Sequence, residues 1–263
     1  MSRKSLKNVM RLIDNAKETL PIEQNFLNDL KRSMELEDEK YHRLPSKTYK
    51  PSGMNCIRAS YYQVSGVTPD EGKSNYTMIG ICNAGTDIHV RVQTAVEQMK
   101  QNNMDCEYID VAEFVKQRNI TYLDIVSKNG METKLYHKTL NMSFMCDGII
   151  KYNNHYYILE IKTESSFKFM NRKEVDPSHY NQGIAYSVAF GLNEVIFLYI
   201  NRDIFDMKAY MFNVTDDMKS DLIGYIDECD SYVKRMIAPP KPENVTKKAC
   251  SYCSYKSQCK KDK

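Results

Sequence analysis

The fold is decided by one stretch of sequence, SFMCDGIIKYNNHYYILEIKT at residues 143–163. This stretch contains two runs rich in β-branched and aromatic residues, 143–152 and 156–163, which are typical of strands. Between the runs lie Asn153 and Asn154, and asparagine is common in tight turns. We therefore predict a β-hairpin.

Charged residues of the hairpin are spaced so that they can meet. Residues two apart on a strand share a face, so Glu160 and Lys162 are expected to point the same way, and Asp147 on the partner strand can join them. Two carboxylates at close range need a cation, and oxygen ligands suit Mg²⁺ or Mn²⁺. With a lysine beside the metal, the pattern predicts metal-assisted phosphodiester hydrolysis. Taken alone, Glu-x-Lys on a strand is also typical of a solvent-exposed ion pair.

Helices and strands alternate on both sides of the hairpin. Upstream, we expect a helix beginning near Thr86 and two strands around Asn129-Gly130. Downstream, the sequence predicts a helix over 178–190, a buried strand over 195–200, and a long helix capped by Thr215 after a further strand. This order predicts an α/β fold with a mixed central sheet flanked by helices.

The chain divides into three expected parts. Apolar residues at helical spacing predict two helices within residues 1–40, which makes 1–53 a helical N-terminal extension. Residues 54–238 form the expected core, and 239–263 hold a cluster of cysteines that follows several prolines.

Composition excludes several classes of protein. The 263 residues are 42% hydrophobic and 27% charged, with a formal net charge of +3, which is typical of a globular domain. We find no apolar run of membrane-spanning length, and the basic first residues are not followed by an apolar signal core. A cytoplasmic protein without membrane contact is therefore expected. The sequence has no Gly-rich phosphate-binding loop with lysine and serine or threonine.

Three of the eight cysteines gather at the carboxyl end. Cys250, Cys253 and Cys259 provide three metal ligands, and Cys56 is the natural candidate for the fourth. Four thiolates hold either an iron–sulfur cluster or a zinc ion. Unligated thiols are a third alternative.

Taken together, the spaced residues resemble the PD-(D/E)XK nucleases, and specifically their RecB-like branch. Asp147 with Glu160-Ile161-Lys162 matches the core motif, and the Ile161 backbone carbonyl is expected among the metal ligands. By this resemblance, His89 on the upstream helix is a further metal ligand. Gln182 and Tyr186 on the downstream helix match the family's glutamine–tyrosine pair, which lies near the active site and toward the DNA backbone.

The resemblance also implies a fold, a cofactor and an activity. The fold would be restriction-endonuclease-like. One cysteine before the core and three after it resemble the AddB nuclease subunit and the CRISPR-associated RecB-like exonucleases, which implies a [4Fe-4S] cluster, with structural Zn²⁺ as the alternative. The implied activity is exonucleolytic digestion of single-stranded DNA ends, with a helicase, recombination or CRISPR-adaptation protein as partner. A non-catalytic DNA-binding or partner-regulating module with the same fold is the rival hypothesis.

Basic and aromatic residues near these motifs are candidate DNA contacts. The candidates are Arg58 and Tyr62 after Cys56, and Lys168, Arg172 and Lys173 after the strand that carries Glu160. Cations can bind phosphates and aromatic rings can stack on bases. Each single lysine is equally typical of a solvated surface.

Overall fold

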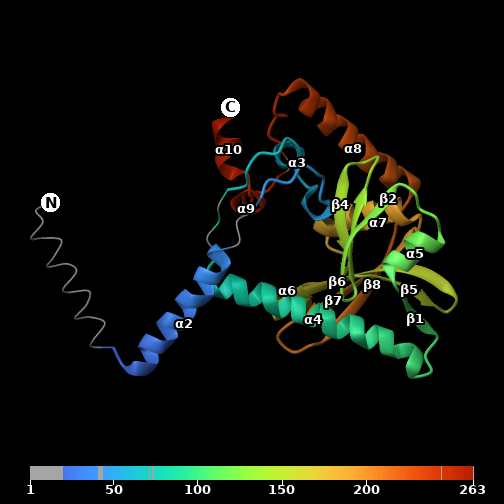
Figure 1. Ribbon diagram of the computed structural model, residues 1–263, viewed down its shortest axis with the longest axis horizontal. Helices are drawn as coiled ribbons and strands as arrows, with labels where there is room; N and C mark the ends of the chain where they lie inside the picture. Colours follow the sequence, from blue (N-terminus) through green and yellow to red (C-terminus); the bar gives the residue numbers. More distant parts are fainter. Residues whose placement is uncertain (1–19, 41–43, 71, 73, 244, 263) are drawn as a thin grey trace, which may run out of the picture. The chain divides into compact units, whose positions relative to one another are not determined.

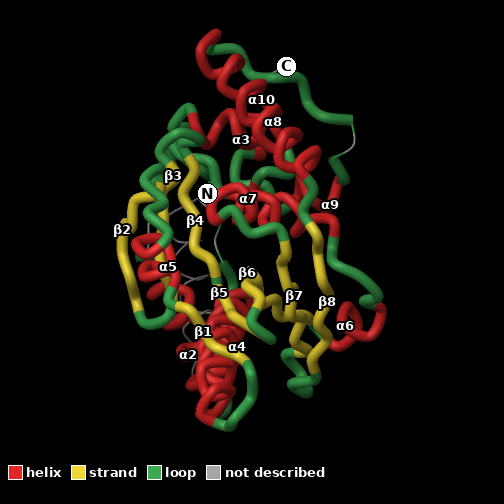
Figure 2. The backbone as a smooth tube through the Cα atoms, turned by 90° about the vertical axis from the view of Figure 1, so that its right-hand side faces the viewer, coloured by secondary structure: helices red, strands yellow, loops and turns green. Residues whose placement is uncertain are grey.

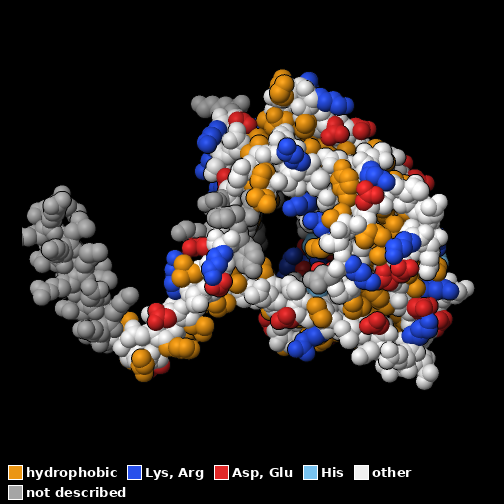
Figure 3. Space-filling model, viewed as in Figure 1, with side chains coloured by type: hydrophobic (Ala, Val, Ile, Leu, Met, Phe, Trp, Pro, Cys, Tyr) orange, Lys and Arg blue, Asp and Glu red, His pale blue; other side chains and the backbone are white. Residues whose placement is uncertain are grey.

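The computed structural model describes residues 20–40, 44–70, 72, 74–243 and 245–262. The chain forms two compact units, one of residues 1–42 with 72–83 and a main unit of residues 43–71 with 84–263. In the first unit, helix α2 (Ile22–Glu39) confirms the second of the two helices predicted there, while the first falls almost entirely outside the described residues. None of the residues of α2 is buried, and Ile22 and Phe26 are exposed. Figure 3 shows hydrophobic side chains along the surface of this helix.

The main unit is built on a mixed five-stranded sheet (Figure 1). The strand order is β1 (Cys106–Ile109), β5 (Gly148–Tyr152), β6 (His155–Glu164), β7 (Glu194–Asn201) and β8 (Met207–Asn213). Strands β6 and β7 are parallel and the other neighbours are antiparallel. Figure 2 shows β6, β7 and β8 side by side, with α6 next to β8. The architecture confirms the predicted α/β class with a mixed sheet flanked by helices.

Helices cover the sheet on both faces. Helix α4 (Tyr76–Gln101) begins in the first unit and continues in the main unit. The other helices of the main unit are α3 (Ile57–Val64), α5 (Val111–Gln117), α6 (Ser166–Asn171), α7 (Tyr180–Phe190), α8 (Asp216–Arg235), α9 (Lys247–Ser251) and α10 (Lys256–Lys261), with short 3-10 turns at Pro51–Gly53 and Pro177–His179. One core joins α7 and α8 to side chains such as Ile158 and Phe197. The other joins α4 to Leu159 and Ile161. Alternate residues of β6 therefore serve opposite layers, as the strand periodicity predicts.

Helix α4 begins earlier than the sequence suggests. We expected a start near Thr86, but the helix runs from Tyr76, where the Asn75 side chain accepts a hydrogen bond of 2.9 Å from the Met78 amide. Asparagine satisfies the free amides at a helix start, and it is this cap that the expectation missed. None of the described helices is long and apolar enough to cross a membrane.

The run 143–152 is two strands rather than one. Strand β4 (Met142–Cys146) pairs with β3 (Glu132–His137), which pairs with β2 (Leu123–Asn129) in a separate three-stranded sheet. After Asp147 the chain enters the five-stranded sheet as β5. The single predicted strand is wrong because each half has its own partners, which local composition does not reveal.

The turn between β5 and β6 confirms the hairpin. Asn153 and Asn154 both have positive φ, 48° and 60°. Two consecutive left-handed residues match the twist of paired strands, and asparagine adopts this conformation at low cost. The turn fixes the register, with Gly148 opposite Leu159. If the same register is extended by one residue beyond this pair, Asp147 lies opposite Glu160.

Gly148 leaves room for the Tyr108 ring. A Cβ atom at residue 148 would lie 2.6 Å from Tyr108 Cε2, while the Tyr108 hydroxyl is bonded to main-chain oxygens and resists displacement. We expect Gly148→Ala to lower the free energy of unfolding by about 1–3 kcal/mol, the usual range for overpacking. Urea unfolding measures it. Gly224→Ala, in open space on α8, is the control and should be neutral or stabilising by up to about 1 kcal/mol. Equal stability changes in the two variants would contradict the account.

Candidate active site

Glu160 lies at the centre of a polar cluster on β6. Its carboxylate is buried, with 2% of the residue exposed. The Lys162 ammonium donates to Glu160 Oε1 at 2.6 Å, and the Gln182 amide donates to the same oxygen at 2.6 Å. The other oxygen, Oε2, has no hydrogen-bond partner among the described residues. One oxygen of this carboxylate is thus held by two donors, and the other is buried without a donor among the described residues.

Asp147 faces Glu160 from the end of β5. The Ile161 amide donates a hydrogen bond to Asp147 Oδ2 at 2.7 Å. The Asp147 side chain thus bonds to β6 just beyond the point where the main-chain pairing of β5 with β6 ends. The other oxygen, Oδ1, lies 3.3 Å from His89 Nδ1 on α4. Helix α4 can approach β6 because residue 85 is glycine: a Cβ there would lie 3.2 Å from Thr163 Oγ1. The predicted residues therefore come together from three elements.

The electrostatics of the cluster favour a bound cation. Burial raises the pKa of Glu160, the neighbouring Asp147 carboxylate raises it further, and Lys162 acts in the opposite direction. A carboxylate that is buried beside another is costly to ionise unless positive charge reaches it. Lys162 supplies one positive charge for two carboxylates, so the site lacks positive charge.

The donor set fits a hard divalent cation. Two carboxylates and an imidazole are suitable ligands for Mg²⁺ or Mn²⁺, and the free Oε2 of Glu160 offers a lone pair. Within the part of the chain that the structure describes, no three His, Cys, Asp or Glu side chains converge closely enough to hold a metal ion. The Ile161 carbonyl stays a predicted ligand.

Gln182 and Tyr186 lie one turn apart on α7 and join the cluster unequally. Gln182 accepts from Lys162 at 2.7 Å and donates to the Tyr186 hydroxyl at 2.7 Å. Tyr186 is only 1% exposed and donates to the Met145 carbonyl at 2.5 Å. Burial also raises its pKa well above the usual value. Tyr186 is therefore enclosed by the protein and accepts a hydrogen bond from Gln182, while the expected role of the pair toward the DNA backbone stays a prediction.

Two residues that the sequence did not single out also contact the site. Gln93 on α4 and Tyr108 on β1 both donate to the main-chain carbonyl of Asp147, at 2.6 Å and 3.1 Å. Gln93 follows His89 by four residues, the spacing that places two side chains on one helix face, and this spacing was the available signal. Tyr108 lies on a strand of four residues that the sequence did not predict.

The four cysteines expected to bind metal are electrostatic neighbours. Burial raises the pKa of the Cys253 thiol, and the charges of Cys56, Cys259 and Cys250 raise it further. None of the four is fully exposed. Cysteines separated by nearly two hundred residues thus influence one sulfur, which fits a shared ligand. The closeness needed for metal ligation is not reached among the described residues.

Arg58 and Tyr62 attach the carboxyl-terminal segment to α3. Arg58 donates to the Pro239 carbonyl at 3.0 Å and to the Asp262 carbonyl, and the Tyr62 hydroxyl donates to the Asp262 carboxylate at 2.9 Å. Both side chains are buried. Their polar atoms are bonded within the protein and hold the segment with the three clustered cysteines. DNA contact by these two residues stays a prediction.

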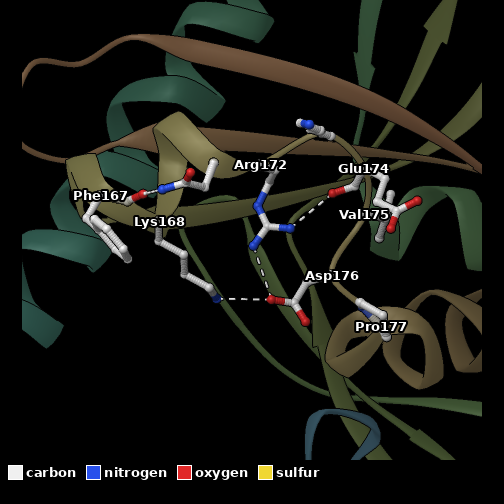
Figure 4. Close-up of a pocket in the computed structure, with 9 residues that line it drawn as sticks. Phe167, Lys168, Arg172, Glu174, Val175, Asp176 and Pro177 are labelled. Carbon is white, nitrogen blue, oxygen red and sulfur yellow. Dashed lines mark hydrogen bonds and ion pairs between the residues drawn. The ribbon is translucent and has the colours of Figure 1, made fainter.

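The candidate DNA contacts after β6 also differ in availability (Figure 4). The Arg172 side chain is 8% exposed and pairs with Glu164 at 2.5 Å. It also pairs with Asp176 at 3.1 Å, as Figure 4 shows. Lys168, at 53% exposure, pairs with the same two carboxylates. Arg172 is therefore held by two carboxylates of the protein, and DNA contact by this residue stays a prediction. Lys173 is exposed, and DNA contact by Lys168 and Lys173 stays a prediction.

Comparison with known proteins adds distant likenesses. No protein-family model matches the chain, and no curated protein matches its sequence. The solved structure of SSO0001 is similar at 16% identity and a TM-score of 0.47, over 90% of this chain and 98% of that chain. An alkaline exonuclease from Laribacter hongkongensis is similar at 9% identity and a TM-score of 0.44, over 73% and 90%. The structure of that exonuclease in complex with dAMP is similar at 11% identity and a TM-score of 0.43, over 75% of this chain and 95% of that chain. Similarity at this level decides neither the family nor the activity of the chain.

The ion pairs around Glu164 predict that loss of the buried carboxylate destabilises the fold more than loss of its exposed partner Lys168. Burial opposes ionisation of Glu164, yet the bonds from Arg172 and Lys168 hold its pKa below the usual 4.5. Glu164→Gln leaves Arg172 undercompensated and should lower the free energy of unfolding by about 3 kcal/mol at pH 7. Lys168→Met, which removes an exposed partner, should cost less than about 1 kcal/mol.

The same contrast should depend on pH. A lowered pKa means that the stabilisation is present above pH 4.5 and is lost as pH falls through the folded-state pKa. The difference between wild type and Glu164→Gln should therefore shrink below that pH. Urea titrations at pH 7 and at lower pH measure the effect, and a difference that is constant with pH would contradict it.

Proposed function

We propose that the protein is a DNA nuclease that hydrolyses phosphodiester bonds with Mg²⁺ or Mn²⁺. The observation that supports this most strongly is the buried Glu160 carboxylate, which is opposed by Asp147 and has one oxygen engaged and one free. A buried carboxylate with a raised pKa and with one oxygen that has no partner among the described residues is typical of a functional site. Chemistry at a site of this kind is the simpler explanation.

The ligands of the proposed metal are Asp147, Glu160, His89 and the Ile161 main-chain carbonyl. A divalent ion bound there would neutralise the two carboxylates and polarise the phosphate and the attacking water. Burial of Glu160 excludes bulk water from one side of the group and strengthens its interactions with neighbouring charge.

We assign to Lys162 the role of stabilising the negative charge that develops on the phosphate. Two of its three N–H groups donate to Glu160 and Gln182, which leaves one for a phosphate oxygen or the attacking water. Water attacks phosphorus while the bond from phosphorus to the leaving sugar oxygen breaks, and a fixed ammonium stabilises the negative charge that grows on the phosphate. Gln182 fixes the position of that ammonium.

The finer assignment follows the sequence resemblance. We propose a RecB-like enzyme that digests single-stranded DNA ends, with Lys168 and Lys173 as contacts to the strand and with a helicase, recombination or CRISPR-adaptation protein as partner. The exposure of both lysines supports this role. The rival is a DNA-binding or partner-regulating module without catalysis, which the presence of a complete set of acidic, basic and amide groups disfavours.

The nuclease proposal predicts metal-dependent digestion that needs the cluster. End-labelled single- and double-stranded DNA, incubated with Mg²⁺ or Mn²⁺, should be degraded by the wild type. Glu160→Gln and Lys162→Met should reduce the rate by at least about 10²–10³-fold, as loss of transition-state stabilisation does. Lys134→Met, an exposed lysine on β3, is the control and should retain full activity. Circular dichroism checks that each variant folds.

Two outcomes would contradict this proposal. Undiminished digestion by both variants would assign the activity elsewhere. Tight DNA binding without cleavage by the wild type, under either metal, would favour the non-catalytic module.

The cysteines support a second metal centre. We propose that Cys56, Cys250, Cys253 and Cys259 hold a [4Fe-4S] cluster, with structural Zn²⁺ as the alternative. The combined effect of the other three thiols on Cys253 supports a shared ligand. Anaerobically purified protein should be brown and contain iron and sulfide, and Cys253→Ser should lose both. Cys82→Ser, at an exposed cysteine in the other unit, is the matched control. Colourless protein that contains zinc would establish the alternative.

A further inference from the structure

The main-chain carbonyl of Asp147 lies outside both sheets. Pairing of β3 with β4 ends at Cys146, and pairing of β5 with β6 ends at Gly148. The residue between them therefore has no strand partner for its carbonyl. Asp147 is only partly exposed, and a carbonyl that is shielded from water needs a donor from elsewhere, because an unmatched polar group in the interior is costly.

Two side chains from different elements supply that donor. The Gln93 amide of α4 donates to Asp147 O at 2.6 Å, and the Tyr108 hydroxyl of β1 lies 3.1 Å from the same oxygen. The hydroxyl also lies 3.3 Å from the Met131 carbonyl, which ties β1 to the turn between β2 and β3. The peptide between Asp147 and Gly148 is thus held from two directions.

Gln93 is an unusual choice for its location. The residue is 1% exposed and lies next to Val92 on the buried side of α4. A methionine or leucine would fill the same space without an amide to satisfy. The amide is explained by its target, since Gln93 bonds the main chain of Asp147 while His89, one turn earlier, faces the carboxylate at 3.3 Å.

We infer that Gln93 and Tyr108 are positioning residues that fix the Asp147 peptide and thereby aim its carboxylate at the site. Rotation of that peptide would move Asp147 Oδ2 away from the Ile161 amide, which donates a hydrogen bond to it at 2.7 Å, and Oδ1 away from His89. The inference deepens the proposed function, on which the metal-ligand role of Asp147 rests. The position of the carboxylate itself does not rest on it.

Three variants test the inference, namely Gln93→Met, Tyr108→Phe and the double variant. Each removes a donor while keeping the side-chain volume, so the packing of the Tyr108 ring over Gly148 is retained. The matched controls are Gln98→Met, exposed on the same helix, and Tyr136→Phe, whose hydroxyl bonds Asn141 at 3.1 Å away from the site. Unfolding of the metal-free proteins is followed in parallel, and Tyr108→Phe decides if the double variant does not fold.

The first measurement is Mn²⁺ affinity from the electron paramagnetic resonance signal of free Mn²⁺. Loss of a group that orients a metal ligand typically weakens binding 10- to 100-fold. We expect about tenfold for each single variant, a larger loss for the double variant and no change in the controls.

The second measurement needs no metal. The Ile161 amide, observed by ¹⁵N–¹H NMR, should exchange faster with solvent and shift upfield in the variants, because its bond to Asp147 is weakened. This response supports the inference even if the wild type binds no Mn²⁺. Lack of Mn²⁺ binding by the wild type would overturn the proposed function and not the inference. An unchanged Ile161 amide in the folded variants overturns the inference.

Discussion

The site depends on one constraint, which is that two carboxylates are held opposite each other where a hairpin meets a change of sheet. The turn at Asn153 and Asn154 sets the register that brings Asp147 to Glu160. Burial and mutual repulsion then raise the pKa of Glu160, so the surroundings must supply positive charge and donors. Lys162 and Gln182 satisfy one oxygen, and the Ile161 amide satisfies one oxygen of Asp147. The fold on both faces of the sheet provides these groups: α7 carries Gln182, and α4 carries His89.

Local chemistry made part of this arrangement predictable. Strand-forming residues on both sides of a pair of asparagines define the hairpin, and a period of two is enough to place Glu160 and Lys162 on one face. Helical spacing places Gln182 and Tyr186 together in the same way. These inferences succeeded because each depends on residues that are close in sequence. The α/β class followed from the order of the elements for the same reason.

Other contacts could not be predicted, because they depend on partners that local composition does not identify. Arg58 and Tyr62 resemble surface contacts until Asp262, two hundred residues later, encloses them. Arg172 resembles a phosphate ligand until Glu164 and Asp176 neutralise it. The break at Asp147 is hidden because the residues on both sides are good strand formers, and only pairing with β3 and β6 separates them. Charge and aromaticity read from sequence therefore do not show which of these side chains the protein itself engages.

The connection between β6 and β7 has a consequence for how the site is assembled in time. The hairpin of β5 and β6 closes a two-residue turn, whereas the parallel pairing of β6 with β7 requires the chain to traverse α6 and α7 first. Short loops close faster and with a smaller loss of entropy than long ones. During folding, Asp147 and Glu160 are therefore expected to meet before α7 delivers Gln182. The two carboxylates, which repel each other, therefore come together early in folding. Gln182, which stabilises Glu160, reaches them only when the connection between β6 and β7 has formed.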